Sequence, residues 1–368
     1  MSNKLKIAII GCGGIANGKH MPSLARQADA EMVAFCDIVE ERAQEAAAAF
    51  GAEGAVVYTD FRKLLEVGGF DIVHVCTPND SHSEITVAAL EAGNHVMCEK
   101  PMAKTTAQAQ EMLDAARRTG KKLSIAYQNR FRSDSEYLKA ACENGELGDI
   151  YFAKAIAVRR RAVPTWGVFL DEEKQGGGPL IDIGTHALDL TLWMMDNYKP
   201  RMVVGSTFHK LGQRENVGSA GNAFGTWDPE QFKVEDSAFG FITMENGATI
   251  VVESSWALNV SEIGEAKTLL AGTEGGADMA DGLRFNGDKG GRLYETKVDL
   301  SAGGVAFYSG GEEDAAAREA RLWLKAVRED TEPVVKPEQA FVVTQILEAI
   351  YESARTGRAV YFDGTSDN

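Results

Sequence analysis

The chain has 368 residues, of which 44% are hydrophobic and 8% aromatic. This is enough for two domains, because single cores usually stop growing at roughly 250–300 residues. Its net charge of −16 gives no electrostatic reason to expect nucleic acid or an anionic membrane as a partner. No apolar run approaches the ~20 residues of a membrane span and no signal peptide is apparent, so we expect a cytoplasmic protein.

The first third of the chain alternates β-rich runs with helical patterns. Three helical patterns, at 40–50, 84–92 and 106–119, each end at a glycine suited to a helix C-terminus. The expected strands are 6–10, 31–36, 56–58, 72–76, 95–98 and 123–127. Several are apolar almost throughout, which is typical of parallel strands buried on both faces. This pattern predicts a doubly wound parallel sheet in an N-terminal domain, residues 1–126.

The pattern changes near residue 127. Long strands joined by irregular links then indicate an open, mainly antiparallel sheet, and a helix at 180–195 interrupts them. The expected strands are 151–160, 201–209, 237–244, 248–257 and 265–271. We assign residues 127–368 to a second α/β domain. Its last two helices, at about 315–356, are candidates to pack back on the first domain.

A glycine- and asparagine-rich stretch, 211–234, is predicted to be a long loop. It could serve as surface cover, as a subunit contact or as a lid over a substrate. The five cysteines lack CxxC spacing, so we expect reduced core residues. No grouping of His, Cys and Glu indicates a metal site.

A glycine-rich loop directly follows the first strand and leads into a helix, which is the context that a dinucleotide-binding loop requires. Gly11 suits the tight turn, Gly13 lets the backbone approach a pyrophosphate, and Ala16 allows close packing of helix and sheet. The helix N-terminus that begins near Gly14 and Ile15 would present N–H groups to the phosphates.

Asp37 ends the second strand, 21 residues after Ala16. An acidic side chain there accepts hydrogen bonds from a ribose 2′-hydroxyl and repels a 2′-phosphate. Ile38 follows in place of the cation that NADP would favour, so the sequence predicts NAD. The alternative for Asp37 is an ordinary strand-end residue.

Polar residues follow two further strands. Because ligands of open α/β sheets bind outside the carboxyl ends of the strands, both loops should face the cofactor. The residues expected there are Thr77, Pro78, Asn79, His82, Glu99 and Lys100.

Three residues can supply the chemistry of alcohol oxidation, which needs a base for the hydroxyl proton. His186 suits this role near neutral pH, and Asp182 lies four residues earlier on the same helix face. Lys100 could stabilise charge on the reacting oxygen. Each alone could equally be a solvated or structural residue, whereas their occurrence with a dinucleotide loop favours catalysis.

Several of these segments resemble the glucose–fructose oxidoreductase, inositol dehydrogenase and MocA (Gfo/Idh/MocA) family. The resemblance implies a Rossmann domain that binds NAD, followed by a substrate domain with a large open sheet, often used to form homo-oligomers such as dimers or tetramers. It also implies catalytic roles for Lys100, Asp182 and His186, and a position for Asn129 and Arg130 next to substrate, with Asn129 also near the cofactor. The matching segments are 11–16, 77–82, 99–101, 128–131 and 178–186 with Asp189.

The run 159–169 further resembles glycoside 3-dehydrogenase-like members, including enzymes that begin C-glycoside deglycosylation by oxidising C3 of the sugar. In that case Arg160 and Trp166 would lie near the sugar; otherwise they are a solvated strand end and a packing indole. Oxidation of a cyclitol, an NAD-retaining glycoside hydrolase or lyase, and a redox-silent sensor are the competing interpretations.

Overall fold

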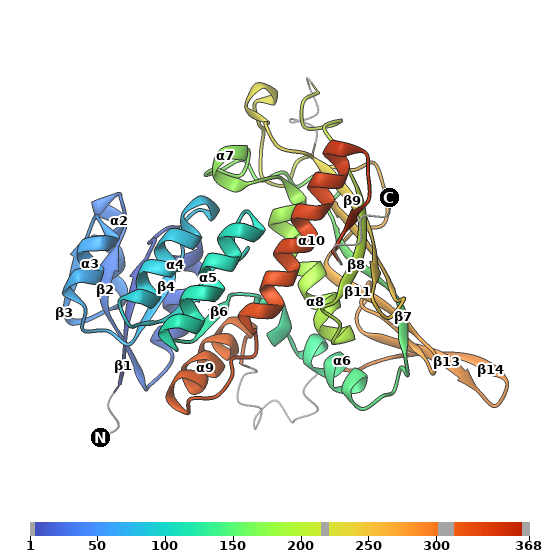
Figure 1. The fold of residues 1–368 in the computed structure, drawn as a ribbon, viewed down its shortest axis with the longest axis horizontal. Helices are drawn as coiled ribbons and strands as arrows, with labels where there is room; N and C mark the ends of the chain where they lie inside the picture. Colours follow the sequence, from blue (N-terminus) through green and yellow to red (C-terminus); the bar gives the residue numbers. More distant parts are fainter. Residues whose placement is uncertain (1–3, 215–220, 301–312, 363–368) are drawn as a thin grey trace. The chain divides into compact units, whose positions relative to one another are not determined.

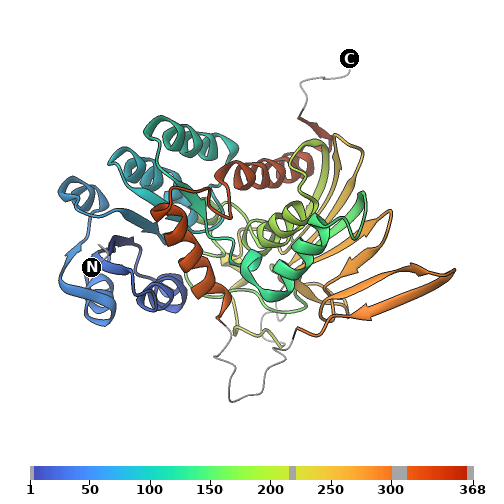
Figure 2. The same ribbon diagram turned by 90° about the horizontal axis from the view of Figure 1, so that it is seen from below.

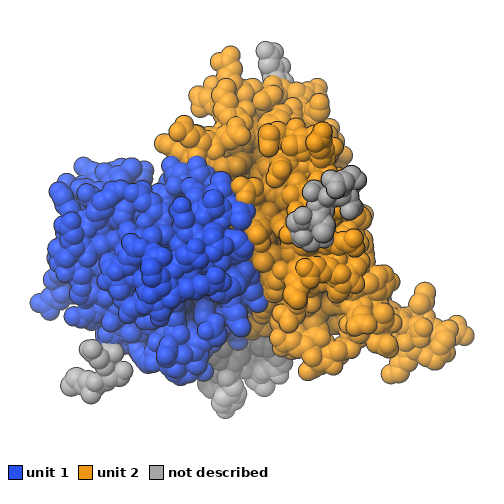
Figure 3. Space-filling view, viewed as in Figure 1, with its two compact units in different colours: residues 1–131, 311–341 blue, residues 132–310, 342–368 orange. Residues whose placement is uncertain are grey.

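The structure is a computed structural model that describes residues 4–214, 221–300 and 313–362. It divides into two compact units, coloured separately in Figure 3. The first comprises residues 1–131 and 311–341, and the second comprises residues 132–310 and 342–368. The boundary between residues 341 and 342 falls inside the last helix, α10 (Pro337–Thr356).

The first unit is built on a six-stranded sheet with the order β3-β2-β1-β4-β5-β6 (Figure 1). All of its strand pairs are parallel, so the predicted doubly wound sheet is confirmed. The strands are β1 (Leu5–Ile10), β2 (Ala30–Cys36), β3 (Gly51–Tyr58), β4 (Ile72–Val75), β5 (His95–Cys98) and β6 (Leu123–Ile125). The helices of two or more turns are α1 (Met21–Ala25) continuing η1 (Ala16–His20), α2 (Glu40–Phe50), α3 (Phe61–Val67), α4 (His82–Glu91), α5 (Thr106–Thr119) and α9 (Ala315–Arg328).

Helix ends in this unit follow local chemistry. At the start of α5 the Thr105 hydroxyl accepts the backbone N–H of Gln108 at 3.3 Å and so caps the helix. Gly120 then ends the helix in the left-handed region, with φ 65°. Gly51 differs from expectation: its φ is −71°, and it begins β3 instead of closing α2 with a left-handed turn. The chain passes there straight from helix to strand, which a glycine signal alone does not reveal.

The sheet and its helices enclose one apolar core. Ile7 and Ile9 of β1 are fully buried and share this core with Met21 and Leu24 of α1. The apolar face of α9 joins the same cluster, with Trp323 2% exposed, so this late segment is an integral part of the first unit.

The second unit contains a nine-stranded sheet with the order β14-β13-β12-β11-β7-β10-β9-β8-β15. It is antiparallel except for the pairing of β7 with β10. The strands are β7 (Ile150–Val158), β8 (Pro200–Phe208), β9 (Ser237–Met244), β10 (Thr249–Ser255), β11 (Gly264–Gly272), β12 (Gly276–Asp278), β13 (Arg284–Lys289), β14 (Arg292–Lys297) and β15 (Val360–Tyr361). The expectation of a large, mainly antiparallel sheet is confirmed.

Helices cover one face of this sheet. They are α6 (Ser133–Glu143), α8 (Thr185–Met195), which continues η4 (Leu180–Gly184), and the C-terminal part of α10, and Figure 2 shows them on one side of the strands. Gly205 and Gly240 allow α10 to approach, because a Cβ at either position would lie within 2.7 Å of Ile350. The opposite face of β8 and β9 exposes apolar side chains such as Phe241, which is 46% exposed.

Strands β12 to β15 were not expected from the sequence. In β14 every residue is exposed, so no alternation of apolar and polar residues marks it. The β13–β14 hairpin extends beyond the other strands of this unit (Figures 1 and 2). Among the described residues of 211–234, the predicted long loop is confirmed, with only the short turn η5 (Pro229–Gln231) inside it; residues 215–220 lie outside the described residues.

Candidate active site

The order of strands in the first unit reverses between β1 and β4. In open α/β sheets the crevice outside the carboxyl ends of strands at such a point binds ligands. The loops that leave β1, β2, β4 and β5 carry the residues that the sequence singled out for a cofactor.

The glycine loop after β1 has the geometry that a dinucleotide requires. Gly11 has φ +91°, and a Cβ there would lie 2.6 Å from the backbone of Cys76, so only glycine fits. Gly13 and Gly14 have no atom within 4 Å of the position of a Cβ, which leaves open space for a pyrophosphate. Ile15 is 42% exposed, whereas Ala16 is fully buried against the sheet.

Asp37 is held at the end of β2 by two backbone groups. Its carboxylate accepts the N–H of Cys12 at 2.8 Å and that of Val39 at 2.9 Å. These bonds tie the acidic side chain to the glycine loop, in the position from which it can meet a ribose. Ile38 beside it is 90% exposed and offers no cation.

The loop after β4 is shaped by His82. Its Nδ1 lies 2.8 Å from the carbonyl oxygen of Pro101, and its Nε2 lies 3.0 Å from that of Thr77. The ring is fully buried and burial lowers its pKa. His82 therefore joins two loops through their backbone. Asn79 is also buried at 8% exposure, while Thr77 and Pro78 form the accessible part of this loop.

The loop after β5 carries Glu99 and Lys100. Glu99 is 4% exposed, and its Oε2 accepts the backbone N–H of Lys100 at 3.0 Å. Its Oε1 lies 2.8 Å from His20 Nε2 and 3.0 Å from Lys19 Nζ. Both oxygens are thus engaged inside the protein. The Lys100–Pro101 peptide bond is cis.

The turn after β6 separates two residues that were expected to act together. Asn129 is partly exposed on η3 (Gln128–Phe131). Arg130 is fully buried and donates to Gln339 Oε1 at 2.7 Å and to the carbonyl oxygen of Val334 at 3.2 Å. Arg130 therefore fastens the segment before α10 within the first unit.

The second unit holds Asp182 and His186 on one continuous helix. A π-helical turn, η4, contains Asp182, and His186 lies in the first turn of α8. They are 6% and 7% exposed. The indole N–H of Trp256 donates to Asp182 Oδ2 at 3.1 Å, which fixes that carboxylate in a buried setting.

The start of this helix is held by Glu235, a residue that sequence reasoning missed. Its carboxylate accepts the backbone N–H of Gly178 at 2.7 Å and that of Leu180 at 3.2 Å, and the Tyr351 hydroxyl donates to it at 2.8 Å. Burial raises the pKa of Glu235 to about 7. A glutamate 57 residues from its helix partner carries no local signal, because capping motifs are recognised only at short spacing.

The same contacts require glycine at the positions before this helix. A Cβ on Gly178 would lie 2.1 Å from the backbone oxygen of Glu235, and one on Gly177 would lie 2.1 Å from the Tyr351 hydroxyl oxygen. The run of glycines therefore permits close approach of Glu235 and Tyr351.

An aromatic chain leads from the surface of the second unit to Asp182. Trp166 is 53% exposed and contacts Phe224 and Phe169 edge to face, with ring centroids 4.9 Å and 5.6 Å away. Phe169 in turn contacts Trp256 at 6.3 Å, the indole that donates to Asp182. Arg160 is exposed, whereas its neighbour Arg159 pairs with Glu265 at 2.6 Å.

Within the first unit the glycine loop, Asp37, the 77–79 loop and Lys100 thus all lie at the carboxyl ends of the parallel strands. Within the second it gathers Asp182, His186 and the aromatic chain. Among residues 4–214, 221–300 and 313–362, no group of three or more His, Cys, Asp or Glu could hold a metal ion. In the same residues no helix has the length and apolar character to cross a membrane.

A parallel sheet with this strand order, glycine loop and acidic strand end defines an NAD-binding oxidoreductase with a second, sheet-based unit. A family model described as "Oxidoreductase family, NAD-binding Rossmann fold" matches residues 5–127, and the GFO/IDH/MocA C-terminal domain matches residues 135–278. The chain belongs to the Gfo/Idh/MocA family, as the sequence resemblance predicted, and its cofactor is NAD.

Characterised relatives support this placement. The chain is 36% identical over 359 residues to a D-glucoside 3-dehydrogenase of Escherichia coli (strain K12), covering 98% of both chains. It is 29% identical over 252 residues to a myo-inositol 2-dehydrogenase of Thermotoga maritima, covering 68% of both. The fold is similar to that of a levoglucosan dehydrogenase solved with NADH and levoglucosan, with a TM-score of 0.79, 23% identity, and coverage of 98% and 99%.

Proposed function

We propose that this oxidoreductase oxidises a secondary hydroxyl, at C3, of a glucoside-type sugar. The observation that carries the proposal is the aromatic chain that connects exposed Trp166 with the buried carboxylate of Asp182. Exposed indole and phenyl rings provide flat apolar surface for the C–H face of a sugar, and a carboxylate can bind its hydroxyls. The 36% identity to a D-glucoside 3-dehydrogenase supports the same substrate class.

In the proposed mechanism, His186 accepts the hydroxyl proton and Asp182, oriented by Trp256, binds a neighbouring hydroxyl or aligns the imidazole. Lys100 donates a hydrogen bond to the reacting oxygen and stabilises its developing negative charge. Asn129 and Arg160 border the sugar. NAD, when bound, supplies the hydride acceptor.

Oxidation at C3 has a chemical consequence. A carbonyl at C3 acidifies the hydrogen at C2, and loss of that proton prepares the departure of the group on C1. The reaction is therefore suited to begin the cleavage of a glycoside, including a C-glycoside whose C1–C bond resists hydrolysis.

The test is to incubate the protein with NAD and methyl β-D-glucopyranoside, and separately with myo-inositol, while NADH absorbance is followed. Reduction of the product with borodeuteride and NMR then locates the oxidised carbon. NADH formation with deuterium at C3 is expected. Label at another carbon, or turnover of myo-inositol alone, would contradict the proposal; the latter would favour a cyclitol dehydrogenase. Sugar release without NADH accumulation would indicate an NAD-retaining hydrolase or lyase.

We also propose that the open face of the second unit's sheet binds a second copy of the chain. On this face Val204 and Phe241 are 42% and 46% exposed, and Phe208 is 37% exposed. Lys154 and Glu253 pair there at 3.1 Å. Because this pair carries both signs, two such faces can meet without repulsion, despite the net charge of −16.

A further inference from the structure

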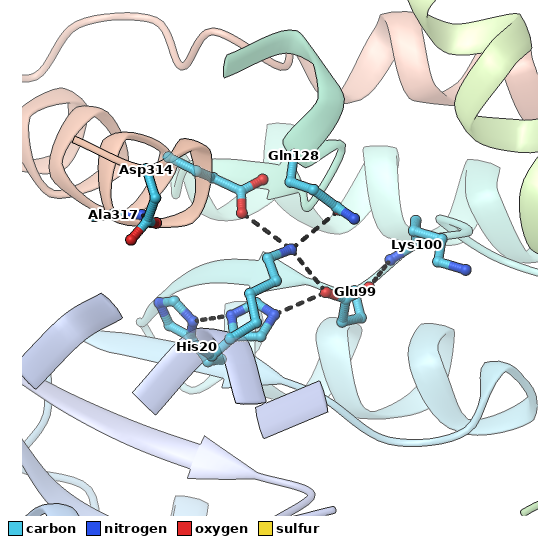
Figure 4. A network of polar contacts seen from close by, with 9 residues as sticks. His20, Glu99, Lys100, Gln128, Asp314 and Ala317 are labelled. Atoms are coloured by element: carbon cyan, nitrogen blue, oxygen red, sulfur yellow. Dashed lines mark hydrogen bonds and ion pairs between the residues drawn. The ribbon is translucent and has the colours of Figure 1, made fainter. Parts of the chain in front are cut away.

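A cluster of buried polar side chains adjoins the loop that carries Lys100 in the first unit (Figure 4). Lys19, in the π-helical turn after the glycine loop, reaches its centre. Its Nζ lies 3.0 Å from Glu99 Oε1, 3.0 Å from Glu319 Oε2 and 3.3 Å from Gln128 Oε1. An ammonium has three N–H donors, so three oxygens from three different elements satisfy it.

Glu99 connects this ammonium to the backbone of Lys100. Its Oε1 forms hydrogen bonds with the side chains of Lys19 and His20, and its Oε2 accepts a hydrogen bond from the backbone N–H of Lys100 at 3.0 Å. In Figure 4, His20, Gln128 and Lys100 surround Glu99. The orientation of the Glu99 carboxylate therefore fixes the position of the backbone at Lys100.

The electrostatics of the cluster make Lys19 the controlling partner. Burial alone would raise the pKa of Glu99, but Lys19 and then His20 hold it well below its usual range. Burial raises the pKa of the other carboxyl, Glu319, although Lys19 opposes the shift. The adjoining cavity measures only about 10 Å³, too small for bulk water to screen these charges. Glu99 is thus the carboxylate that stays ionised, and it does so because of Lys19.

We propose that Lys19 is a positioning residue for the catalytic lysine: by keeping the Glu99 carboxylate ionised and fixed, it holds the backbone of Lys100 in place for reaction. This inference rests on the proposed role of Lys100. Lys19 belongs to no part of the glycine loop itself and is 9% exposed, so it acts through Glu99 and not by touching the sugar.

The test compares Lys19→Met, which removes the charge at similar length, with Lys19→Arg, which retains it. Lys4→Met, the same substitution at an exposed lysine of the first unit, is the matched control. Methyl β-D-glucopyranoside and NAD are the probes. Lys19→Met should lower kcat roughly 10–100-fold, since small displacements of a reacting group cost up to about 10²-fold. Without its cation, Glu99 becomes protonated as pH falls, so kcat of this variant should show an additional decline toward low pH beyond the one that it shares with the wild type. Lys19→Arg should recover part of the rate. Lys4→Met, which leaves the cluster around Lys19 intact, should remain within about threefold of wild type.

Two further measurements separate positioning from mere stability. The affinity for NADH, followed by fluorescence, should change less than threefold in Lys19→Met, which shows that the dinucleotide loop is intact. Combining Lys19→Met with Lys100→Met should slow the enzyme little beyond Lys100→Met alone, because residues that act through one another are not additive. If Lys19→Met does not fold, the double variant Lys19→Met/Glu99→Gln is used instead, because it removes both charges of the pair. Its kcat should fall, and its pH profile should not show the additional decline toward low pH that protonation of Glu99 causes.

A folded Lys19→Met enzyme with a lower melting temperature but the wild-type kcat and pH profile would overturn the inference and leave Lys19 a purely structural residue. So would a wild-type kcat in the folded double variant. Failure of the proposed function is a different result: Lys100→Met itself would then retain the wild-type rate.

Discussion

His186 is the residue on which the proposed chemistry depends most. It is 7% exposed on the helix that also carries Asp182, a setting in which a ring can be held for proton transfer. His186→Ala should lower kcat roughly 10²–10⁴-fold, the usual contribution of a positioned base. Affinity for NADH should persist, because the glycine loop belongs to the other unit. A variant within a few-fold of wild type would remove His186 from the mechanism, and simultaneous loss of NADH binding would mark it as structural.

Ile38 and Asp37 should decide the choice between NAD and NADP. The Asp37 carboxylate repels a 2′-phosphate, and Ile38, 90% exposed beside it, can be replaced without disturbing a packed side chain. Ile38→Arg should raise kcat/KM with NADP, and adding Asp37→Asn should lower kcat/KM with NAD by roughly 10–100-fold, because hydrogen bonds to a charged group contribute about 1.5–3 kcal/mol. Comparable kcat/KM values for the two cofactors in the wild type would refute this assignment. The melting temperature of each variant is the control, since Asp37 also binds the N–H of Cys12.

Glu235 should make the stability of the fold depend on pH. Burial raises its pKa in the folded protein to about 7, above the unfolded value of about 4.3. A group with a raised pKa stabilises the fold below its unfolded pKa, and that contribution is lost as pH rises through the folded pKa. Between about pH 4.3 and 7 the wild type should therefore lose up to about 4 kcal/mol of stability relative to Glu235→Gln, from ~1.4 kcal/mol per pKa unit. Denaturant unfolding of both proteins across this range measures the difference. Parallel stability curves would show that Glu235 does not titrate there.

At the scale of elements, the start of the helix with Asp182 requires glycine for reasons of space. Gly178→Ala places a Cβ 2.1 Å from the backbone oxygen of Glu235, and backbone cannot give way as a flexible side chain can. Its melting temperature should fall, with a cost of about 1–3 kcal/mol for overpacking. Gly18→Ala is the matched control, because Gly18 is helical and has nothing within 4 Å of its Cβ position. Equal stability of the two variants would contradict the close approach.

The candidate site residues differ in how far the sequence alone predicts them. The glycine loop, Asp37, Lys100, Asp182 and His186 were recognisable because each stands at a fixed distance from a strand end or a turn. The cluster around Lys19 and the cap by Glu235 were not, because their partners lie 80 and 57 residues away and meet only when the sheets form. The contacts of His82 and Arg130 were not predictable either: both side chains are buried against backbone carbonyl groups, which their positions in the sequence do not reveal.

At the scale of the whole molecule, the open face of the nine-stranded sheet should decide the oligomeric state. Phe241 of β9 lies opposite Val204 of β8 and Val251 of β10 and is 46% exposed. If a second copy covers this face, light scattering should give a dimer or a larger even assembly for the wild type. Phe241→Glu should shift the mass toward the monomer, because it brings two unpaired carboxylates together across a two-fold axis. Lys4→Glu, at an exposed position of the first unit, changes charge away from this face and should leave the mass unchanged. A monomeric wild type, or a Phe241→Glu variant that keeps its full mass, would show that this face is not the interface.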